Sequence, residues 1–398
     1  MTACKARQIV ACLFLAGLFP ASAAAGFGEC IGEIRSEAIS RGIEAATADQ
    51  LLADLAPSER VIELDRRQPE FTATLNDYLT ARVNDARIDR GRALLDEHAE
   101  LLQGIRRDYG VPGRYLIAFW GLETNFGSYT GRMPTVQSLA TLACDRRRGE
   151  FFREQLLAAL HLVDERTLEP EQLRGSWAGA LGNFQFLPSV YRDHAVDADG
   201  DGRKDLWDSL PDAAVSAAAF LRARGWEPGE RWGREVQLPD GFDYALAERK
   251  QSLRAWRDAG LRTADGGPLP VADLAARLLI PAGADGPAFL VYNNFDVIMR
   301  WNPSRFYALS VGLLADRLIG APPLSNPPPV EEPLRIETVS ALQEALNRRG
   351  FDAGAVDGRI GTNTRRALRA FQADAGLVDD GHPDTDTLEE LGINQSGR

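Results

Sequence analysis

Hydrophobic residues recur at helical spacing along most of the chain. Between residues 36 and 110 the apolar positions fall three to four residues apart, and the alternation typical of a half-buried strand is absent. One such stripe is formed by Leu94, His98, Leu101 and Ile105. Helical spacing returns in 213–224 and in 293–318. The pattern predicts a mainly α fold, in which His98 is a core or edge residue rather than a ligand.

Two segments depart from this pattern. Between residues 226 and 292 short strand-like runs occur at 235–238, 277–280 and 288–292, which predicts a small irregular α+β subdomain. Prolines then crowd residues 321–329, and each proline fixes its own backbone, so this stretch is typical of a stiff, extended linker. Beyond the linker, short amphipathic helices alternate with glycine-containing turns.

The first 25 residues have the pattern of a secretory signal peptide. An apolar run over 9–19 follows two basic residues and is itself followed by Pro20 and the small residues 21–25. This run is too short to span a membrane as a stable anchor, and small residues suit cleavage. The sequence before Cys12 is only faintly like a lipoprotein cleavage box, so lipidation is not favoured. We expect an exported protein with no transmembrane anchor after cleavage.

Removal of the signal peptide would leave two cysteines, Cys30 and Cys144. Two thiols in an exported protein most often form a disulfide, which here would tie the N-terminal segment to the middle of the chain. Two buried free thiols are the alternative. The cysteines do not have the spacing of a metal site.

Composition and charge narrow the class of partner. The chain has 398 residues, of which 44% are hydrophobic and 26% charged, as in soluble globular proteins of two or three domains. Its net charge is -12 and its pI is near 5.0. Binding to nucleic acid normally requires a clustered basic surface, so the charge argues against a nucleic-acid partner.

Glu123 lies where a helical pattern ends. Apolar residues seven, four and three positions earlier would share its helix face: Leu116, Phe119 and Trp120. Loss of hydration on that face disfavours the charged form, so we expect this carboxyl to keep its proton at a higher pH than a free glutamate, as a general acid must. Asn125 and Gly127 would end the helix and leave the acid at the edge of a cleft. The alternative is an ordinary glutamate in the last turn of a helix.

The segment 175–189 combines small residues with flat and polar ones. Its glycines and alanines allow a close approach of the backbone. Its flat faces and hydrogen-bonding groups are those of Trp177, Phe184, Phe186, Ser176 and Gln185. This combination suits a sugar ligand. A glycine-rich turn between two helices is the alternative.

Three consecutive arginines, 146–148, stand out in an acidic protein. Arginine binds carboxylates through two parallel hydrogen bonds, so Arg147 and Arg148 are candidates for holding a substrate that carries a carboxylate. The alternative is a solvated start of the following helix.

The acidic loop 197–208 has the spacing of a calcium-binding loop. Oxygen ligands fall at loop positions 1, 3, 5, 7, 9 and 12, namely Asp197, Asp199, Asp201, the carbonyl of Arg203, Asp205 and Asp208. Carboxylates this close would repel each other without a cation, so we predict bound Ca²⁺. An aspartate at position 12, in place of glutamate, predicts weak affinity. A solvated acidic turn is the alternative.

Three segments together resemble the B-type family of lytic murein transglycosylases. They are the Gly-x-Glu-Thr-x-x-Gly motif around Glu123, the Ser-Trp-Ala-Gly-Ala-x-Gly-x-x-Gln-Phe-x-Pro-Ser motif of 176–189, and the acidic loop. They occur in the family's order within residues 30–320. The resemblance implies a lysozyme-like, mostly helical fold, peptidoglycan glycan strands as substrate, and Glu123 as the single catalytic acid. It also implies that the calcium loop serves stability, not chemistry.

The same resemblance implies two further cleft residues. The family brings an aromatic residue and an asparagine into the cleft, and these positions map onto Trp301 and Asn302. Tyrosine is the aromatic expected there. The tryptophan therefore removes a hydroxyl and keeps a face on which a sugar can stack.

Residues 334–391 resemble the small three-helix peptidoglycan-binding domain. The likeness includes 339–346, the turn 357–361 and Phe371-Gln372. It implies that this domain holds the enzyme on its insoluble polymer and so raises its effective concentration. His382 is isolated, and a zinc ligand set is not seen. We expect four parts: signal peptide 1–25, catalytic domain 26–320, linker 321–333 and peptidoglycan-binding domain 334–392.

The resemblance also implies a mechanism without a catalytic cofactor. Most glycosidases use two carboxyl groups, but no second carboxylate in a motif stands beside Glu123 in the sequence. One carboxyl suffices if it acts first as acid and then as base, and if a hydroxyl of the substrate closes a 1,6-anhydro ring. Ser176 and Gln185 would then orient the acetamido sugar. A hydrolytic muramidase and a non-catalytic wall-binding protein are the alternatives, and we expect a monomer in the periplasm.

Overall fold

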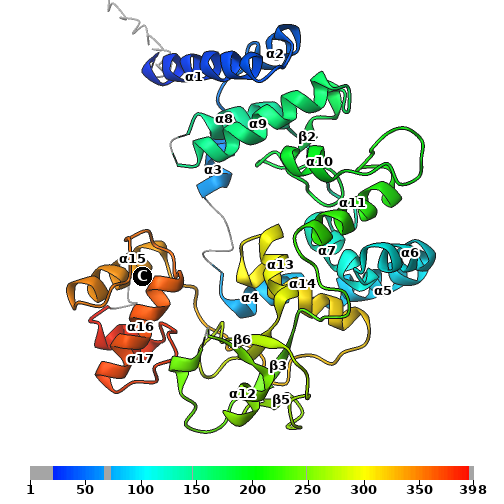
Figure 1. Ribbon diagram of the computed structural model, residues 1–398. Helices are drawn as coiled ribbons and strands as arrows, with labels where there is room; N and C mark the ends of the chain where they lie inside the picture. Colours follow the sequence, from blue (N-terminus) through cyan, green and yellow to red (C-terminus); the bar gives the residue numbers. More distant parts are fainter. Residues whose placement is uncertain (1–20, 67–72, 146, 248, 394–398) are drawn as a thin grey trace, which may run out of the picture.

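The computed structural model describes residues 21–66, 73–145, 147–247 and 249–393, and the side chains from residue 26 onward. It is mostly helical (Figure 1). The first fourteen helices are α1 (Ala21–Ser40), α2 (Ala45–Leu52), α3 (Glu59–Arg66), α4 (Leu75–Arg82), α5 (Asp85–Glu97), α6 (Ala99–Tyr109), α7 (Gly113–Thr124), α8 (Thr135–Ala143), α9 (Gly149–Asp164), α10 (Pro188–His194), α11 (Leu210–Ala223), α12 (Leu253–Asp258), α13 (Asn293–Trp301) and α14 (Arg305–Leu318). Short 3₁₀ turns span Pro170–Gln172 and Tyr244–Leu246.

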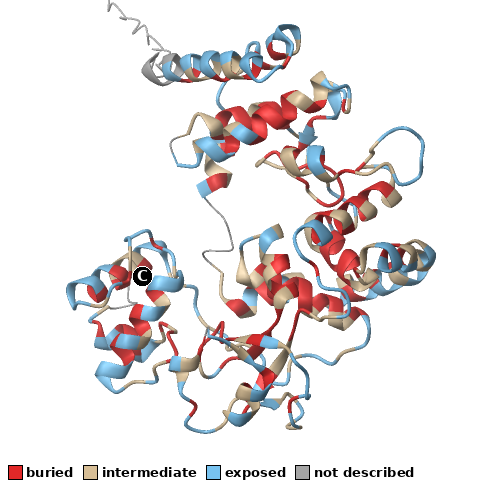
Figure 2. Ribbon diagram, in the orientation of Figure 1, coloured by how far each residue is buried: buried red, intermediate tan, exposed pale blue. Residues whose placement is uncertain are grey.

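Helix α7 is the centre of the large helical core. Its residues from Tyr115 to Gly121 are all buried, as expected for a helix that is apolar on every side (Figure 2). The helix starts after Pro112 and ends at Asn125, which adopts the left-handed conformation with φ 50°. Helix α14 packs along α7. Phe119 of α7 and Leu309 of α14 are both 0% exposed and belong to the same hydrophobic core.

Two boundaries differ from the sequence pattern. His98 separates α5 from α6, so the stripe that contains it is divided between two helices. Pro303 lies two residues beyond the end of α13, and Ser304 caps α14 by accepting a hydrogen bond from the amide of Tyr307 at 3.2 Å. The expected helical segment 293–318 is therefore two helices with a turn between them.

The predicted α+β subdomain is a five-stranded antiparallel sheet with its own small core. The strands of the chain are β1 (Met133–Pro134), β2 (Arg174–Gly175), β3 (Gly233–Gln237), β4 (Lys250–Ser252), β5 (Arg262–Thr263), β6 (Ala275–Leu279) and β7 (Ala288–Val291). The order in the sheet is β4-β6-β7-β3-β5, and Glu235 pairs with Phe289 across β3 and β7. Trp256 and Leu278, both 0% exposed, fill the core of this subdomain.

The C-terminal unit has three helices and a separate core. They are α15 (Ile336–Arg348), α16 (Thr362–Ala375) and α17 (Thr385–Glu390). Leu342, Leu368 and Leu388 meet at 0% exposure between them. The predicted three-helix fold of this segment is confirmed.

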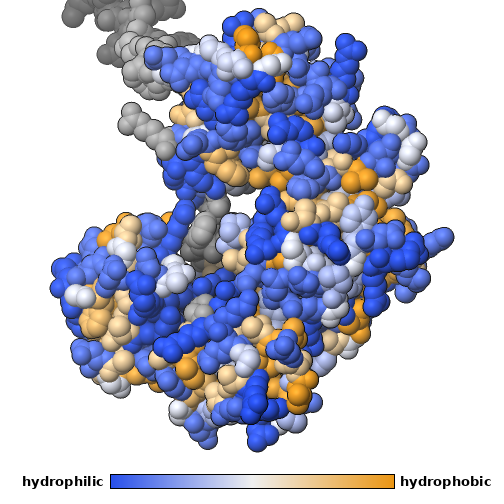
Figure 3. Space-filling model, in the orientation of Figure 1, coloured by the Kyte–Doolittle hydropathy of each residue, from blue (hydrophilic) through white to orange (hydrophobic). Residues whose placement is uncertain are grey.

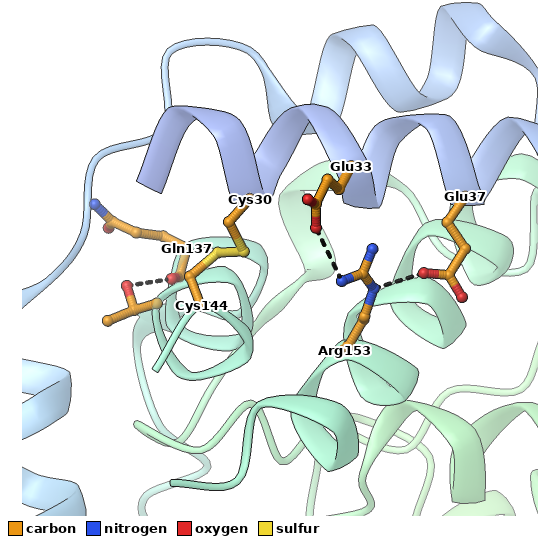
Figure 4. The surroundings of a disulfide bond; sticks show 7 residues. Cys30, Glu33, Glu37, Gln137, Cys144 and Arg153 are labelled. Atoms are coloured by element: carbon orange, nitrogen blue, oxygen red, sulfur yellow. Dashed lines mark hydrogen bonds and ion pairs between the residues drawn. A yellow bond between two sulfur atoms is a disulfide. The ribbon is translucent and has the colours of Figure 1, made fainter. Parts of the chain in front are cut away.

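A disulfide joins the N-terminal helix to the helical core. Cys30 lies in α1 and Cys144 directly follows α8, 114 residues later (Figure 4). On the same face of α1, the guanidinium of Arg153 lies between Glu33 and Glu37. Helix α1 is thus fixed across α8 and α9 by a covalent bond and by ion pairs.

Candidate active site

Glu123 sits near the C-terminal end of α7 and is half-buried. Two donors from distant parts of the chain meet at its Oε1. The indole Nε1 of Trp301 donates at 2.9 Å, and the hydroxyl of Tyr307 donates to the same oxygen. Because Trp301 ends α13 and Tyr307 lies in the first turn of α14, the turn at Pro303 is what brings both donors to the carboxyl.

Tyr307 is a fixed hydrogen-bond donor. Burial raises the pKa of its hydroxyl well above the ordinary value of 10.0, and the negative charge of Glu123 and the hydrogen bond to it raise the pKa further. The hydroxyl therefore remains protonated at neutral and moderately alkaline pH. It can orient Glu123 in either protonation state of the carboxyl.

Aromatic rings hold Trp301 in place. Its ring centroid lies 4.4 Å from that of Phe119, 5.5 Å from that of Phe186 and 5.3 Å from that of Phe220. Phe184 and Phe186 are only 2% and 1% exposed. The prediction that these two phenylalanines stack on sugars is therefore wrong, because they are packed in the core behind Trp301.

The loop after α7 is tied to the 175–189 segment. Oγ1 of Thr124 donates to the carbonyl of Asn183 at 2.8 Å, and Trp120 donates to the Asn183 side chain at 2.8 Å. Gly131, at φ +90°, lies so close to Gly175 that an added Cβ would stand 2.2 Å from its carbonyl carbon. The two marked segments of the sequence therefore form one unit around Glu123.

Ser176 and Gln185 lie within this unit. Oγ of Ser176 accepts the amide of Ala180 at 3.1 Å. Nε2 of Gln185 donates to the carbonyls of Thr130 and Gly182 at 3.0 and 2.9 Å. Both side chains have a structural contact, and their predicted contact with a sugar stays a prediction.

The two candidate arginines meet a carboxylate of the protein. The guanidinium groups of Arg147 and Arg148 each pair with Asp65, which is 5% exposed at the end of α3. Arg148 also lines the cavity described below. Arg146, the first arginine of the run, lies outside the described residues. Contact of Arg147 and Arg148 with a substrate remains a prediction.

A large cavity lies between the helical core and the C-terminal unit. Its volume is about 1770 Å³. On the core side it is lined by Trp177, Trp301 and Asn302, and on the other side by residues of α15, α16 and the turns beside them. Figure 3 shows the face hollowed between these two parts, with mostly hydrophilic walls. Asn302, whose Oδ1 accepts the amide of Ser304 at 3.2 Å, reaches this cavity from the turn between α13 and α14.

The acidic loop gathers a cluster of carboxylates that only partly overlaps the predicted calcium ligands. Among the described residues, one carboxylate oxygen each of Asp197, Asp199 and Asp212 lies within 4.8 Å of the others. Asp212, in the first turn of α11, also accepts the amides of Ala198 at 2.7 Å and Asp205 at 2.8 Å. Clustered carboxylate oxygens are the donors that Ca²⁺ prefers.

Other predicted calcium ligands have hydrogen-bond partners within the loop. Asp201 pairs with the guanidinium of Arg203 at 2.9 Å. Asp205 accepts the amides of Trp207 and Asp208, at 2.9 and 3.0 Å. The carboxylate cluster thus shares Asp197 and Asp199 with the set expected from the loop spacing and adds Asp212, which lies beyond the twelve-residue loop, while the predicted ligand set stays a prediction.

Sequence reasoning also missed Tyr307, Asn183 and Asp65. A signal existed for Tyr307, because a tyrosine on the buried face of α14 needs a partner for its hydroxyl. For Asn183, the signal was an asparagine among small residues directly after a glycine. Asp65 gave no signal, because its contact with the arginines joins segments about eighty residues apart.

None of the helices among the described residues is long and apolar enough to cross a membrane. Most of the predicted signal peptide lies outside the described residues.

Known proteins with similar sequences and structures share this architecture. Membrane-bound lytic murein transglycosylase B of Escherichia coli (strain K12) is 33% identical over 240 residues, which cover 59% of this chain and 64% of that protein. The alignment thus spans less than two thirds of that relative. The crystal structure of Pseudomonas aeruginosa SltB3 in complex with NAG-anhNAM-pentapeptide is 43% identical, with a TM-score of 0.87, and covers 92% of this chain and 99% of that chain. An Escherichia coli lytic transglycosylase in complex with calcium is 28% identical, with a TM-score of 0.61, and covers 74% and 92%.

Two sequence families match the chain. Residues 26–316 match the transglycosylase SLT domain family, and residues 335–391 match a peptidoglycan-binding domain family. The expected lysozyme-like, mainly helical fold and the resemblance to the B-type transglycosylases are confirmed. Since the first match covers most of the chain and places Glu123 within it, the chain belongs to the transglycosylase SLT domain family.

Proposed function

We propose that the chain is a lytic murein transglycosylase and that Glu123 is its single catalytic carboxyl. One observation carries the proposal: two neutral donors, Trp301 and Tyr307, hold the same oxygen of Glu123, and Trp301 itself lines the cavity. With Oε1 assigned to accept these hydrogen bonds, Oε2 is the oxygen that would carry the transferable proton. Fixed orientation of this kind is what a general acid requires.

The reaction would proceed in two proton transfers. Glu123 first protonates the oxygen of the β-1,4 bond between N-acetylmuramic acid and N-acetylglucosamine, and the bond from C1 to that oxygen breaks. The muramyl N-acetyl oxygen stabilises the positive charge that develops at C1. Glu123, now a carboxylate, takes the proton of the C6 hydroxyl, and O6 bonds to C1. The product is a 1,6-anhydromuramyl end, and water is not consumed.

The neighbouring residues would bind the sugars. Ser176 and Gln185 orient the acetamido groups, since the Oε1 of Gln185 can accept a hydrogen bond while its Nε2 holds the loop. Trp301 and Asn302 complete the cleft wall. Arg147 and Arg148 would contact the lactyl or peptide carboxylates. Arg148 is the better placed of the two, because it lines the cavity.

A calcium ion would stabilise the acidic loop. Asp197, Asp199 and Asp212 would hold it, as the clustering of their oxygens supports. A similar lytic transglycosylase has been crystallised with calcium. The ion would take no part in catalysis.

The location would be the periplasm. The signal-peptide pattern of residues 1–25 supports export, and the proposed substrate lies there. We infer a monomer without a lipid anchor, in which the C-terminal domain keeps the enzyme on its polymer.

Replacing Glu123 with glutamine tests the proposal. The amide keeps the size and the hydrogen-bond acceptor but cannot transfer a proton. Lytic activity on purified peptidoglycan should fall by about a hundredfold to ten-thousandfold. Glu150→Gln, a change of the same kind on α9, is the control and should keep normal activity. Normal activity of Glu123→Gln would refute the role given to Glu123.

A further inference from the structure

The proline-rich segment is bound to the sheet. Both carboxylate oxygens of Glu235, in β3, accept backbone amides of this segment: Oε2 that of Ser325 at 2.9 Å and Oε1 that of Asn326 at 2.8 Å. The Asn326 side chain in turn donates to the carbonyl of Gly286 at 2.7 Å. Hydrogen bonds to an ionised acceptor are among the strong ones. The segment is thus fixed at its middle, and a freely extended linker would not need these contacts.

The C-terminal unit makes a second contact with the same part of the sheet. Asp380 is 6% exposed, and its Oδ2 accepts the amide of Ala284 at 2.7 Å, in the turn between β6 and β7. Gly283, at φ +73°, lies so close that an added Cβ would stand 2.9 Å from the Cβ of His382. The His382 ring also contacts the carboxylate of Glu331 at 3.0 Å. The turn 280–287 is therefore held by the linker through Gly286 and by the C-terminal unit through Ala284.

These contacts decide where the C-terminal unit stands relative to the cavity. The cavity of about 1770 Å³ is lined by Trp301 and Asn302 on one side and by Gln343, Asp357 and Thr364 on the other. A polymer that occupies the cavity would touch both walls at once. A tethered domain on a mobile linker would instead bind the polymer at a variable distance from the cleavage site.

We propose that Glu235 and Asp380 are positioning residues, which hold the C-terminal domain as a fixed wall of the cleft so that it binds the same glycan strand that Glu123 cleaves. The inference rests on the proposed function for the identity of the polymer. It predicts that the domain contributes to turnover of strands long enough to reach both walls. It also predicts no contribution to turnover of a fragment that fills only the cleft at Glu123.

The test compares the variants Glu235→Ala, Asp380→Ala and the double variant with the unchanged chain. Asp240→Ala, which removes an exposed carboxylate just beyond β3, is the matched control. Small-angle X-ray scattering measures whether the C-terminal domain has moved away. Kinetics are measured on soluble, uncross-linked glycan strands and on a tetrasaccharide fragment of them.

We expect the double variant to have a larger radius of gyration and to lose about tenfold in kcat/KM on long strands, mainly through KM, with the tetrasaccharide rate unchanged. Glu235→Gln keeps one acceptor oxygen, so its radius of gyration and its kcat/KM on long strands should lie between those of the unchanged chain and those of Glu235→Ala. An unchanged radius of gyration, or a larger radius with unchanged kinetics on long strands, would overturn the proposal. So would equal losses on both substrates, which would mean damage to the catalytic site. Failure of the unchanged chain to cleave any strand would instead refute the proposed function.

Discussion

At the scale of single residues, two neutral groups hold one oxygen of Glu123. They are the indole of Trp301 and the phenol of Tyr307, and neither carries a positive charge that would favour the ionised form of the carboxyl. Trp301 supplies an N–H where the resemblance led us to expect a tyrosine hydroxyl, and Tyr307 supplies a hydroxyl from the next helix.

Removing the hydroxyl of Tyr307 tests its role in orienting the acid. We expect Tyr307→Phe to lower kcat by about tenfold to a hundredfold, since a hydrogen bond to an ionisable group is lost, while KM changes little. The measurement is steady-state cleavage of soluble glycan strands. Tyr129→Phe, which removes a hydroxyl from a tyrosine that is 62% exposed, should behave like the unchanged chain. Equal rates for Tyr307→Phe and Tyr129→Phe would contradict the assignment.

The sequence places Glu123 correctly near the end of a helix, because local information suffices for that position. Its apolar helix face, the stop at Asn125 and the surrounding motif all lie within about ten residues. Tyr307 and Asp65 could not be placed in the same way, because their partners are far away in the chain. Phe184 and Phe186 were misplaced because composition cannot tell an aromatic residue that faces a ligand from one that supports the wall behind it.

At the scale of elements, the acidic loop is anchored to both the core and α11. Asn183 accepts from Trp120 and donates to the carbonyls of Leu206 and Trp207 at 3.2 and 2.6 Å, so it links α7 to the end of the loop. Asp212 ties the start of the loop to α11. A cation at this loop would therefore stabilise the position of α7 as well as the loop.

Calcium should raise the melting temperature of the unchanged chain. At a free concentration a hundred times the Kd, binding to the folded state alone contributes about 2.7 kcal/mol, or a few degrees in Tm. Differential scanning calorimetry with calcium and with a chelator measures this shift. Asp199→Asn should abolish it, and Asp208→Asn should keep it, because Asp208 is outside the cluster of carboxylate oxygens. If Asp208→Asn instead abolished the shift in Tm and Asp199→Asn kept it, the ligand set expected from the loop spacing would be supported and the cluster with Asp212 contradicted.

Elements were predicted more accurately than their ends. The three strand-like runs in 235–292 correspond to β3, β6 and β7, and the C-terminal segment has its three helices. The break at Pro303 and the division at His98 were missed, because helical periodicity continues across both turns. Proline in the middle of the 293–318 pattern was the available signal.

At the scale of the whole molecule, buried tyrosines link stability to alkaline pH. Burial is the largest cause that raises the pKa of Tyr115, Tyr292 and Tyr307, whereas tyrosines in the unfolded chain titrate near the ordinary value of about 10. The folded state therefore keeps protons that the unfolded state releases. The stabilising contribution is fully present below about pH 10 and is lost as the pH rises above it.

We therefore expect the urea midpoint to fall between pH 9 and pH 11, as measured by circular dichroism. The chain has only three lysines, so tyrosines dominate titration in this range. Tyr292→Phe should make the fall smaller, and Tyr129→Phe, at an exposed position, should leave it unchanged. A midpoint that stays constant over this range would contradict the argument.

The molecule as a whole combines a catalytic core, a sheet and a polymer-binding unit around one cavity. The sequence predicts each part, because each has its own periodicity and its own core. Their arrangement could not be predicted, because it depends on contacts such as that of Glu235 with Asn326, in which a strand binds a linker about ninety residues away. The proline-rich composition suggested a spacer, and the hydrogen bonds of the segment show it fixed to the sheet.

The central claim is that one carboxyl, Glu123, cleaves the glycan without water as a reactant. Mass spectrometry of the fragments released from purified peptidoglycan by the mature protein tests this most directly. The account predicts 1,6-anhydromuramyl ends, lighter than hydrolysed ends by one water, and none of these products with Glu123→Gln. Fragments with ordinary reducing ends would contradict it, because water would then be the nucleophile and a second carboxylate would have to activate it.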